Sequence, residues 1–350
     1  MKNKILRWVC VFLALAVFMP AVVSCNNTSD GEDTRPTDES TSEAVTDESE
    51  VVYGDVSSKE NNIRVLIASD VHHTNVETWY GMQSSLRMRY WVEAIKKEHE
   101  EKPFDLIIIA GDTSLDHYGN KGSYTTSSVS TTKEFVDKYV SELPDGVPVY
   151  ILPGNHEQFS NAQWKQFTGN DRQFAVEMKG NLFICLDNYN SKLEPYRTGD
   201  PDYTLTDVDY VKEQMEKHPD CQNVWLVAHH FDPKLETQEF KDIVKNDKRI
   251  KGLFAGHSHK SNIIDLGADF GNKKLAQTGN YSWNYYSATN TGTYSELVDA
   301  FWGFRDLVIN DGYAMSQYIV AETKGPIVPL NSTNYPIDIK RKTVYNIRYY

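Results

Sequence analysis

The sequence is short of cysteine and has no excess of basic residues. It holds four cysteines in 350 residues, and its 36 Lys and Arg residues face 49 Asp and Glu residues, giving a formal net charge of −13. Nucleic-acid binding without sequence preference needs a basic face, which a chain of this charge balance is not expected to present. We therefore expect no nucleic-acid-binding surface, whereas the 40% hydrophobic content is sufficient for a substantial core.

The N-terminal part of the chain has no apolar run long enough to span a bilayer comfortably. Its apolar run, over residues 8–23, follows three basic residues and is typical of a secretory signal. The run ends in Val-Val-Ser-Cys at residues 22–25, which resembles a bacterial lipoprotein cleavage site with Cys25 as the lipidated residue. The alternative is a plain secretory signal beside a coincidental cysteine. We expect residues 1–24 to be a lipoprotein signal peptide, and the mature protein to be extracytoplasmic and anchored to the cell membrane by lipid.

Residues 25–60 contain few large apolar side chains and hold 11 acidic residues against two basic ones. Such a segment cannot bury enough apolar surface to offset the entropy lost on ordering, so we expect a disordered tether; an acidic recognition tail is the alternative. Residues 61–350 show neither an internal repeat nor a second boundary, and we expect them to form one domain. Within it, Cys185 lies in an apolar run and is expected to be buried, and whether it pairs with Cys221 stays open.

Short apolar runs alternate with segments of helical apolar spacing along this domain. The alternation, with further strands near the end, predicts a layered α/β domain with two sheets. Thr206 is the expected N-cap of one helix, and three segments have no assignment, namely 114–130, 188–205 and 280–299. The expected strands are 63–68, 104–110, 147–152, 173–178, 181–187, 224–228, 251–255, 273–278, 301–310, 316–322 and 343–349, and the expected helices are 85–101, 131–142, 206–217 and 237–246.

Five polar clusters stand where five of these strands end. Each cluster alone is a weak signal, but ligands bind beyond the carboxyl ends of strands in α/β sheets. Together the clusters supply two carboxylates, an amide and four imidazoles, a set of oxygen and nitrogen ligands that suits two divalent cations and predicts metal-assisted hydrolysis. The clusters are Asp70-Val71-His72, Gly111-Asp112, Gly154-Asn155-His156-Glu157, His229-His230 and Gly256-His257-Ser258-His259.

The order D-x-H, G-D, G-N-H-E, H and G-H-x-H, from Asp70 to His259, resembles the motifs of the calcineurin-like metallophosphoesterase superfamily. The resemblance implies a double β-sheet sandwich flanked by helices. It also implies hydrolysis of a phosphoester by a hydroxide that bridges two metal ions. Carried over by position, the first ion is bound by Asp70, His72, Asp112 and His259, and the second by Asp112, Asn155, His229 and His257, with Asp112 shared.

His156 matches the histidine that points at the substrate in this superfamily. It would stabilise the transition state or protonate the departing oxygen, which slightly favours a phosphodiester over a phosphomonoester as substrate. The alternative is a hydrogen bond that merely orients a metal ligand. In purple acid phosphatases a tyrosine ligand follows the bridging aspartate by three residues, but Leu115 stands at that position here. The tyrosinate variant is thereby disfavoured, and Mn, Fe and Zn all stay open.

Other polar residues of the clusters have weaker assignments. His73 and His230 each follow an implied ligand, so we expect both side chains to face away from the ion bound by their neighbour, either beside the site or as structural filling. Glu157 and Asp116 are expected behind the ligands or toward solvent. Four aromatic residues either line the substrate cleft or pack a loop: Tyr281, Trp283, Tyr285 and Tyr286.

A different class of function competes with hydrolysis. A lipid anchor, an acidic tether and exposed histidines would also suit a surface lipoprotein that binds a metal or solute without catalysis. Asn155 argues against it, because an amide is a weak ligand that metal capture alone would not favour. The substrate and the oligomeric state have no readable signal in the sequence.

Overall fold

Two six-stranded mixed sheets form the framework of the fold. The computed structural model describes residues 62–75, 83–190, 192–193, 201–282, 302–322 and 340–350. The expected signal peptide, Cys25 and the tether lie outside these residues. The first sheet has the order β12-β11-β10-β1-β2-β3 and the second β4-β5-β6-β7-β9-β8. The first sheet comprises β1 (Ile63–Ala68), β2 (Leu106–Ala110), β3 (Val149–Leu152), β10 (Gly303–Ile309), β11 (Ala314–Val320) and β12 (Lys342–Arg348); the second comprises β4 (Phe174–Met178), β5 (Asn181–Leu186), β6 (Asn223–Ala228), β7 (Ile250–Ala255), β8 (Ile263–Asp265) and β9 (Lys274–Gln277).

The central strands of both sheets run parallel. In the first sheet β1 pairs with β2 and β2 with β3, and in the second sheet β5, β6, β7 and β9 follow one another in the same direction. Parallel strands are nearly continuous in apolar residues because both of their faces are covered. The carboxyl ends of parallel neighbours lie at one edge of a sheet, so residues that follow them are brought together.

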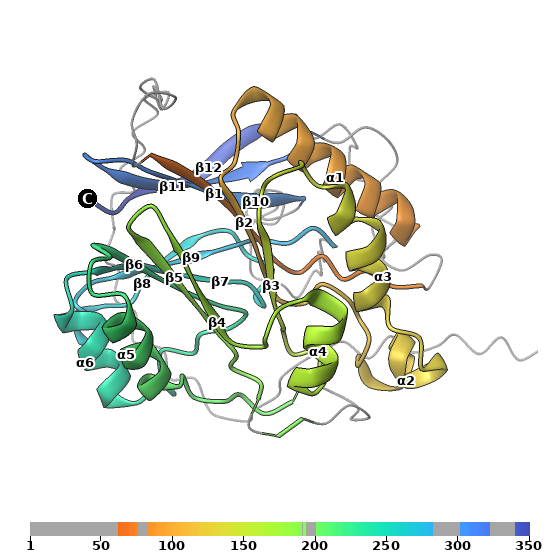
Figure 1. Cartoon of the computed structure of the whole chain (residues 1–350), viewed down its shortest axis with the longest axis horizontal. Helices are drawn as coiled ribbons and strands as arrows, with labels where there is room; N and C mark the ends of the chain where they lie inside the picture. The colour runs from red at the N-terminus through yellow and green to blue at the C-terminus, as the bar shows by residue number, and fades with distance from the viewer. Residues whose placement is uncertain (1–61, 76–82, 191, 194–200, 283–301, 323–339) are drawn as a thin grey trace, which may run out of the picture. The chain divides into compact units, whose positions relative to one another are not determined.

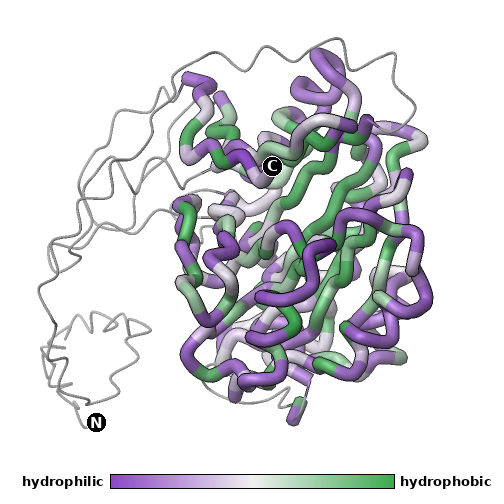
Figure 2. The backbone as a smooth tube through the Cα atoms, turned by 90° about the vertical axis from the view of Figure 1, so that its left-hand side faces the viewer, coloured by the Kyte–Doolittle hydropathy of each residue, from purple (hydrophilic) through white to green (hydrophobic). Residues whose placement is uncertain are grey.

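The two sheets pack face to face with helices on their outer faces (Figure 1). Side chains of both sheets, such as Ile67 in β1 and Val227 in β6, share one apolar cluster between them. The outer face of the first sheet is covered by α1 (Ser84–Glu101), α3 (Thr131–Lys138) and α4 (Asn161–Thr168), and that of the second by α5 (Val208–Lys217) and α6 (Gln238–Asn246). In Figure 2 hydrophobic residues follow the strands, and hydrophilic ones dominate the outer segments. The predicted α/β sandwich with flanking helices is confirmed.

Local chemistry explains where the elements begin. The apolar residues Met88, Trp91 and Ile95 of α1 recur at helical spacing and are fully buried. At α5 the sequence prediction was wrong by one residue: Asp207, not Thr206, is the N-cap and accepts a hydrogen bond from the Tyr210 N–H. The Thr206 hydroxyl is instead 2.7 Å from a Glu236 carboxylate oxygen, to which it donates.

Among the described α-helices and strands, three were not predicted. They are α2 (Ser123–Ser127), α4 and β8, each short. The signal for α4 was present, because Ser160 and Gln163 form a reciprocal capping box at its start. Cys185 and Cys221 are both buried and unpaired. Within the described ranges, no helix combines the length and hydropathy needed to cross a membrane.

Candidate metal centre

The seven residues implied as ligands follow parallel strands of both sheets, and the structure brings them to one place. Asp70 and His72 follow β1, Asp112 follows β2 and Asn155 follows β3. From the second sheet, His229 follows β6, and His257 and His259 follow β7. The last two are half-buried and the other five are buried.

Asp112 lies in the middle of the group. Its Oδ2 is 3.2 Å from His72 Nε2 and 3.2 Å from His229 Nε2, so imidazoles from two sheets face one oxygen. The other oxygen, Oδ1, accepts a hydrogen bond from the backbone N–H of His156 at 3.1 Å. Burial raises the pKa of Asp112, but the imidazoles of His156 and His229 outweigh it and hold the pKa well below its ordinary value.

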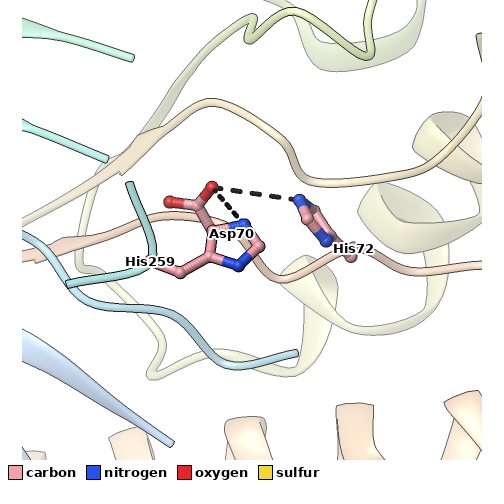
Figure 3. Close-up of side chains that lie close together, drawn as sticks. All are labelled: Asp70, His72 and His259. Atoms are coloured by element: carbon pink, nitrogen blue, oxygen red, sulfur yellow. Dashed lines mark ion pairs between the residues drawn. The ribbon is translucent and has the colours of Figure 1, made fainter. Parts of the chain in front are cut away.

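Asp70 presents one oxygen to the same space (Figure 3). Its Oδ2 is held by Ser69 and by the backbone N–H of His257 at 3.0 Å. Its Oδ1 is buried, accepts no hydrogen bond of good geometry, and faces His259 Nε2 at 3.3 Å and His72 Nε2 at 3.9 Å. A buried carboxylate oxygen without a donor is costly unless a cation satisfies it.

Asn155 and two histidines form the other side. Asn155 Oδ1 is 3.0 Å from His229 Nε2 and 3.0 Å from His257 Nδ1. The second nitrogen of His229, Nδ1, is 2.9 Å from the carbonyl oxygen of Ala110 and donates to it, which leaves Nε2 directed at oxygens. Burial lowers the pKa of His229, yet the carboxylates of Asp112 and Asp70 raise it to about 10. This position therefore favours positive charge.

These observations test whether two divalent cations fit the residues present. Asp70 Oδ1, Asp112 Oδ2 and Asn155 Oδ1 all face imidazole nitrogens rather than hydrogen-bond donors of the backbone. The donors are carboxylate, amide and imidazole, without a thiolate, which suits Mn, Fe or Zn. The residues fit such a centre.

Strained backbone accompanies the candidate ligands. Asp70, His72, Asp112, His257 and His259 have φ between 51° and 64°, the left-handed region that non-glycine residues seldom adopt. Each such residue costs on the order of 1–3 kcal/mol and persists only where its surroundings hold it. Strain of this kind collects at functional sites.

Two glycines allow the strand-end loops to approach one another. A Cβ on Gly154 would lie 2.1 Å from Asp112 Oδ1, and one on Gly256 would lie 2.5 Å from Asp70 Oδ2. Any larger residue at either position would displace a candidate ligand. The glycines of the sequence motifs are therefore required by space.

Glu157 lies behind the candidate ligands, as one of the two sequence alternatives expected. It is fully buried, and its carboxylate accepts backbone N–H groups of Asp112, Ser114 and Gly154 at 3.0, 2.9 and 2.7 Å and the Thr113 hydroxyl at 3.0 Å. Burial and the Asp112 carboxylate raise the pKa of Glu157 to about 8. All four partners donate hydrogen bonds, which opposes this rise because donors favour the ionised carboxylate.

Two buried arginines also support the loops, and the sequence analysis missed both. Arg87 of α1 donates to the carbonyl oxygens of Val71 and, at 2.9 Å, of His72. Arg172 donates to the carbonyl oxygen of Glu157 at 2.7 Å and pairs with Asp187. A charged residue on the apolar face of a predicted helix was the available signal for Arg87.

His156 lies beside Asp112 and near the surface. Its Nε2 is 3.6 Å from Asp112 Oδ2, and its ring is packed edge-on against His72 and Tyr118, with centroid separations of 5.3 and 5.1 Å. The side chain is oriented by these two rings, and the residue is 9% exposed. Tyr118, from the unassigned loop 114–130, is a neighbour that the sequence analysis did not identify.

The other flagged polar residues lie outside the group of seven. His73 is near Ser84, at 3.0 Å, and Glu134, which confirms that it faces away. Asp116 is buried and caps α3 through the backbone N–H groups of Thr131 and Thr132.

His230 is turned toward Tyr189, whose hydroxyl is 3.0 Å from its Nδ1. The His230 ring stacks on His257 with a centroid separation of 4.3 Å. Burial, reinforced by the nearby His257, lowers the pKa of His230 to about 3, so its imidazole is neutral. This residue therefore supports a candidate ligand by packing.

Of the four aromatic residues with two alternatives, the structure describes only Tyr281. Tyr281 is fully buried and stacks on Trp302 in the core, which supports packing for that residue. Trp283, Tyr285 and Tyr286 lie outside the described residues. Leu115, three residues after Asp112, is buried.

A two-sheet sandwich that gathers carboxylates, an amide and imidazoles at its strand ends defines a metal-dependent hydrolase. The model of the calcineurin-like phosphoesterase family matches residues 63–261, more than half of the chain, and the protein belongs to this family. By family it is therefore a phosphoric ester hydrolase. Membership of this family implies a dinuclear centre of divalent cations, and the structure holds groups of Asp and His side chains that could bind such ions.

Solved structures resemble the fold. A dimetal phosphatase from Danio rerio aligns over 81% of this chain and 98% of its own, with 12% identity and a TM-score of 0.52. A purple acid phosphatase from yellow lupin (Lupinus luteus) aligns over 82% of this chain and 54% of its own, with 12% identity and a TM-score of 0.47. No curated protein matches the sequence. At such identities the likeness is one of fold.

Proposed function

We propose that the protein hydrolyses a phosphoester, a phosphodiester in preference to a monoester, at a centre of two divalent cations. One ion would be held by Asp70, His72, Asp112 and His259, and the other by Asp112, Asn155, His229 and His257. The observation that carries this assignment is the position of Asp112 Oδ2, 3.2 Å from an imidazole of each set. Among carboxylate, amide and imidazole donors, only a carboxylate carries a negative charge to share between two cations.

The chain's own residues would position the reaction. When bound, the cations would acidify a water molecule and neutralise charge on the phosphoryl oxygens. His156, oriented by His72 and Tyr118, would donate a proton to the departing oxygen. Assistance to a leaving group by His156 slightly favours a diester, and the proposed preference for diesters rests on this step.

The types of donor atom limit which metal ions the centre is expected to bind. Carboxylate, amide and imidazole ligands accept Mn, Fe and Zn, and Leu115 in place of a tyrosine disfavours the tyrosinate-to-iron variant. We further propose that Cys25 is lipidated and that residues 25–60 tether the enzyme to the outside of the cell membrane. The basic and then apolar N-terminus and the acidic composition that follows it support this location.

The test is an assay of the purified chain with an aryl phosphodiester and an aryl phosphomonoester, each with added Mn²⁺. We expect turnover of both, with the higher kcat/KM for the diester. Equal or reversed values would remove the diester preference alone. Tight metal binding without turnover of either would contradict the enzymatic assignment and favour a metal-binding lipoprotein.

A further inference from the structure

A second group of metal-ligating side chains lies at the opposite end of the second sheet. It comprises Glu177 near the end of β4, His218 just after α5, and Cys221 before β6. The His218 Nδ1 is 2.6 Å from a Glu177 carboxylate oxygen, and the three donor atoms all lie within 4.8 Å of one another.

Backbone geometry places His218 and Cys221 together. They are separated by Pro219 and Asp220, and the N–H of Cys221 donates to the carbonyl oxygen of His218 at 3.3 Å, which closes a tight turn. Two ligands separated by two residues are a common arrangement in zinc sites. The spacing is a second observation, independent of the side-chain contacts, that points to a metal ion.

Glu177 is held opposite this turn by the β4–β5 hairpin. It pairs with Leu182 in the antiparallel register of β4 and β5. The Gln222 N–H donates to the carbonyl oxygen of Gly180 at 3.2 Å, which joins the hairpin to the turn that carries Cys221. The backbone therefore presents all three donors to one point before any ion binds.

The exposed fractions of the three side chains show that an ion could reach the group from solvent. Cys221 is 1% exposed, whereas the side chains of His218 and Glu177 are 27% and 50% exposed. The thiol thus forms the floor of the group, and the imidazole and carboxylate form its rim. Three protein ligands with an open side leave a position for water, as zinc accepts.

We propose that Glu177, His218 and Cys221 form an additional cation site that binds Zn²⁺. Thiolate, imidazole and carboxylate together favour zinc over Mn²⁺, Mg²⁺ or Ca²⁺, which prefer oxygen ligands. The site is separate from the phosphoesterase centre, because the six residues of β6 span roughly 20 Å between the two ends of the sheet. A bound ion would join the β4–β5 hairpin to the end of α5. This proposal does not depend on the proposed function.

Cobalt(II) provides a probe that distinguishes the two centres. A thiolate bound to Co²⁺ gives a sulfur-to-metal charge-transfer band in the near ultraviolet, and the phosphoesterase centre has no thiolate ligand. We expect the full chain to develop this band on titration with Co²⁺, Cys221→Ser to lose it, and Cys185→Ala to keep it as the matched control. Zinc added afterwards should displace cobalt and abolish the band.

A second variant keeps the test valid if replacement of the buried cysteine disturbs folding. His218→Gln alters a partly exposed residue, and we expect its zinc affinity at this site to fall by about 100-fold or more, since even an outer partner of a ligand is worth ~10–100-fold. Phosphodiester turnover should be unchanged in each variant. A full chain without the band, a band retained in Cys221→Ser, or unaltered zinc affinity in His218→Gln would overturn the proposal and leave an ordinary surface ion pair.

Discussion

The two sheets contribute unlike halves to the candidate metal centre. The first-sheet half, namely Asp70, His72, Asp112 and Asn155, contains both carboxylates and is supported by buried charged residues such as Glu157 and Arg87. The second-sheet half comprises His229, His257 and His259. Its imidazoles are supported by a carbonyl oxygen and by the stacked ring of His230.

The difference follows from the cost of burial. A buried carboxylate is costly unless donors or cations surround it, so the first-sheet half needs a network that fixes its loops. An imidazole needs only one hydrogen bond to set its orientation, and packing supplies the rest. We therefore expect changes in the residues that support the first-sheet half to affect metal binding and the fold, and changes in the residues that support the second-sheet half to affect one ion weakly.

Asp112→Asn should have the largest effect. The amide keeps the shape of the side chain but removes the charge shared between the two halves. Activity should fall at least about a thousandfold, and metal should be lost from both positions. Metal analysis of the purified protein together with kcat measures this, and a variant that retained two ions per chain would show that Asp112 is not shared.

His156→Ala should have the next largest effect. The imidazole contacts His72 without belonging to either proposed ligand set. Turnover of a phosphodiester should fall on the order of 100-fold because proton donation is lost, while both ions stay bound. The paired measurement is kcat with metal content, and full activity in this variant would exclude the proposed role.

Glu157→Gln tests the support of the first-sheet half. The new NH₂ group would face a backbone N–H, leaving a buried donor unsatisfied at about 1–3 kcal/mol in the free energy of unfolding. Metal affinity should also fall by roughly 10–100-fold. Urea unfolding and metal titration measure the two effects. Glu213→Gln, which alters an exposed pair with Lys217 on α5, is the control and should change stability by less than about 0.5 kcal/mol.

His230→Ala should have the smallest effect, because it removes only packing from the second-sheet half. Loss of the ring stacked on His257 is worth about 1 kcal/mol, or about fivefold in affinity for one ion. His230→Phe retains the stacking and should bind metal nearly as the wild type does. If His230→Ala instead lost both ions, the two halves would not differ as described.

The ends of the strands were readable from the sequence, whereas the support behind them was not. Asp70, Asp112 and His229 each follow a short apolar run, so local patterning located them. The left-handed backbone at His72 and the donation from Arg87 of α1 to the His72 carbonyl oxygen depend on tertiary packing, which local patterning does not reveal. The helix α4 was missed because only Trp164 is fully buried in it, which leaves little periodicity to detect.

The central claim is that a phosphoester is hydrolysed by a pair of ions held jointly by the two sheets. Titrating the metal-free chain with Mn²⁺ while following hydrolysis of an aryl phosphodiester tests it most directly. The oxygen and nitrogen donors should bind this ion, whereas the thiolate group at Cys221 should not. We predict that activity rises until two Mn²⁺ ions are bound per chain and then stays constant. Full activity with one ion, or none with two, would contradict the account.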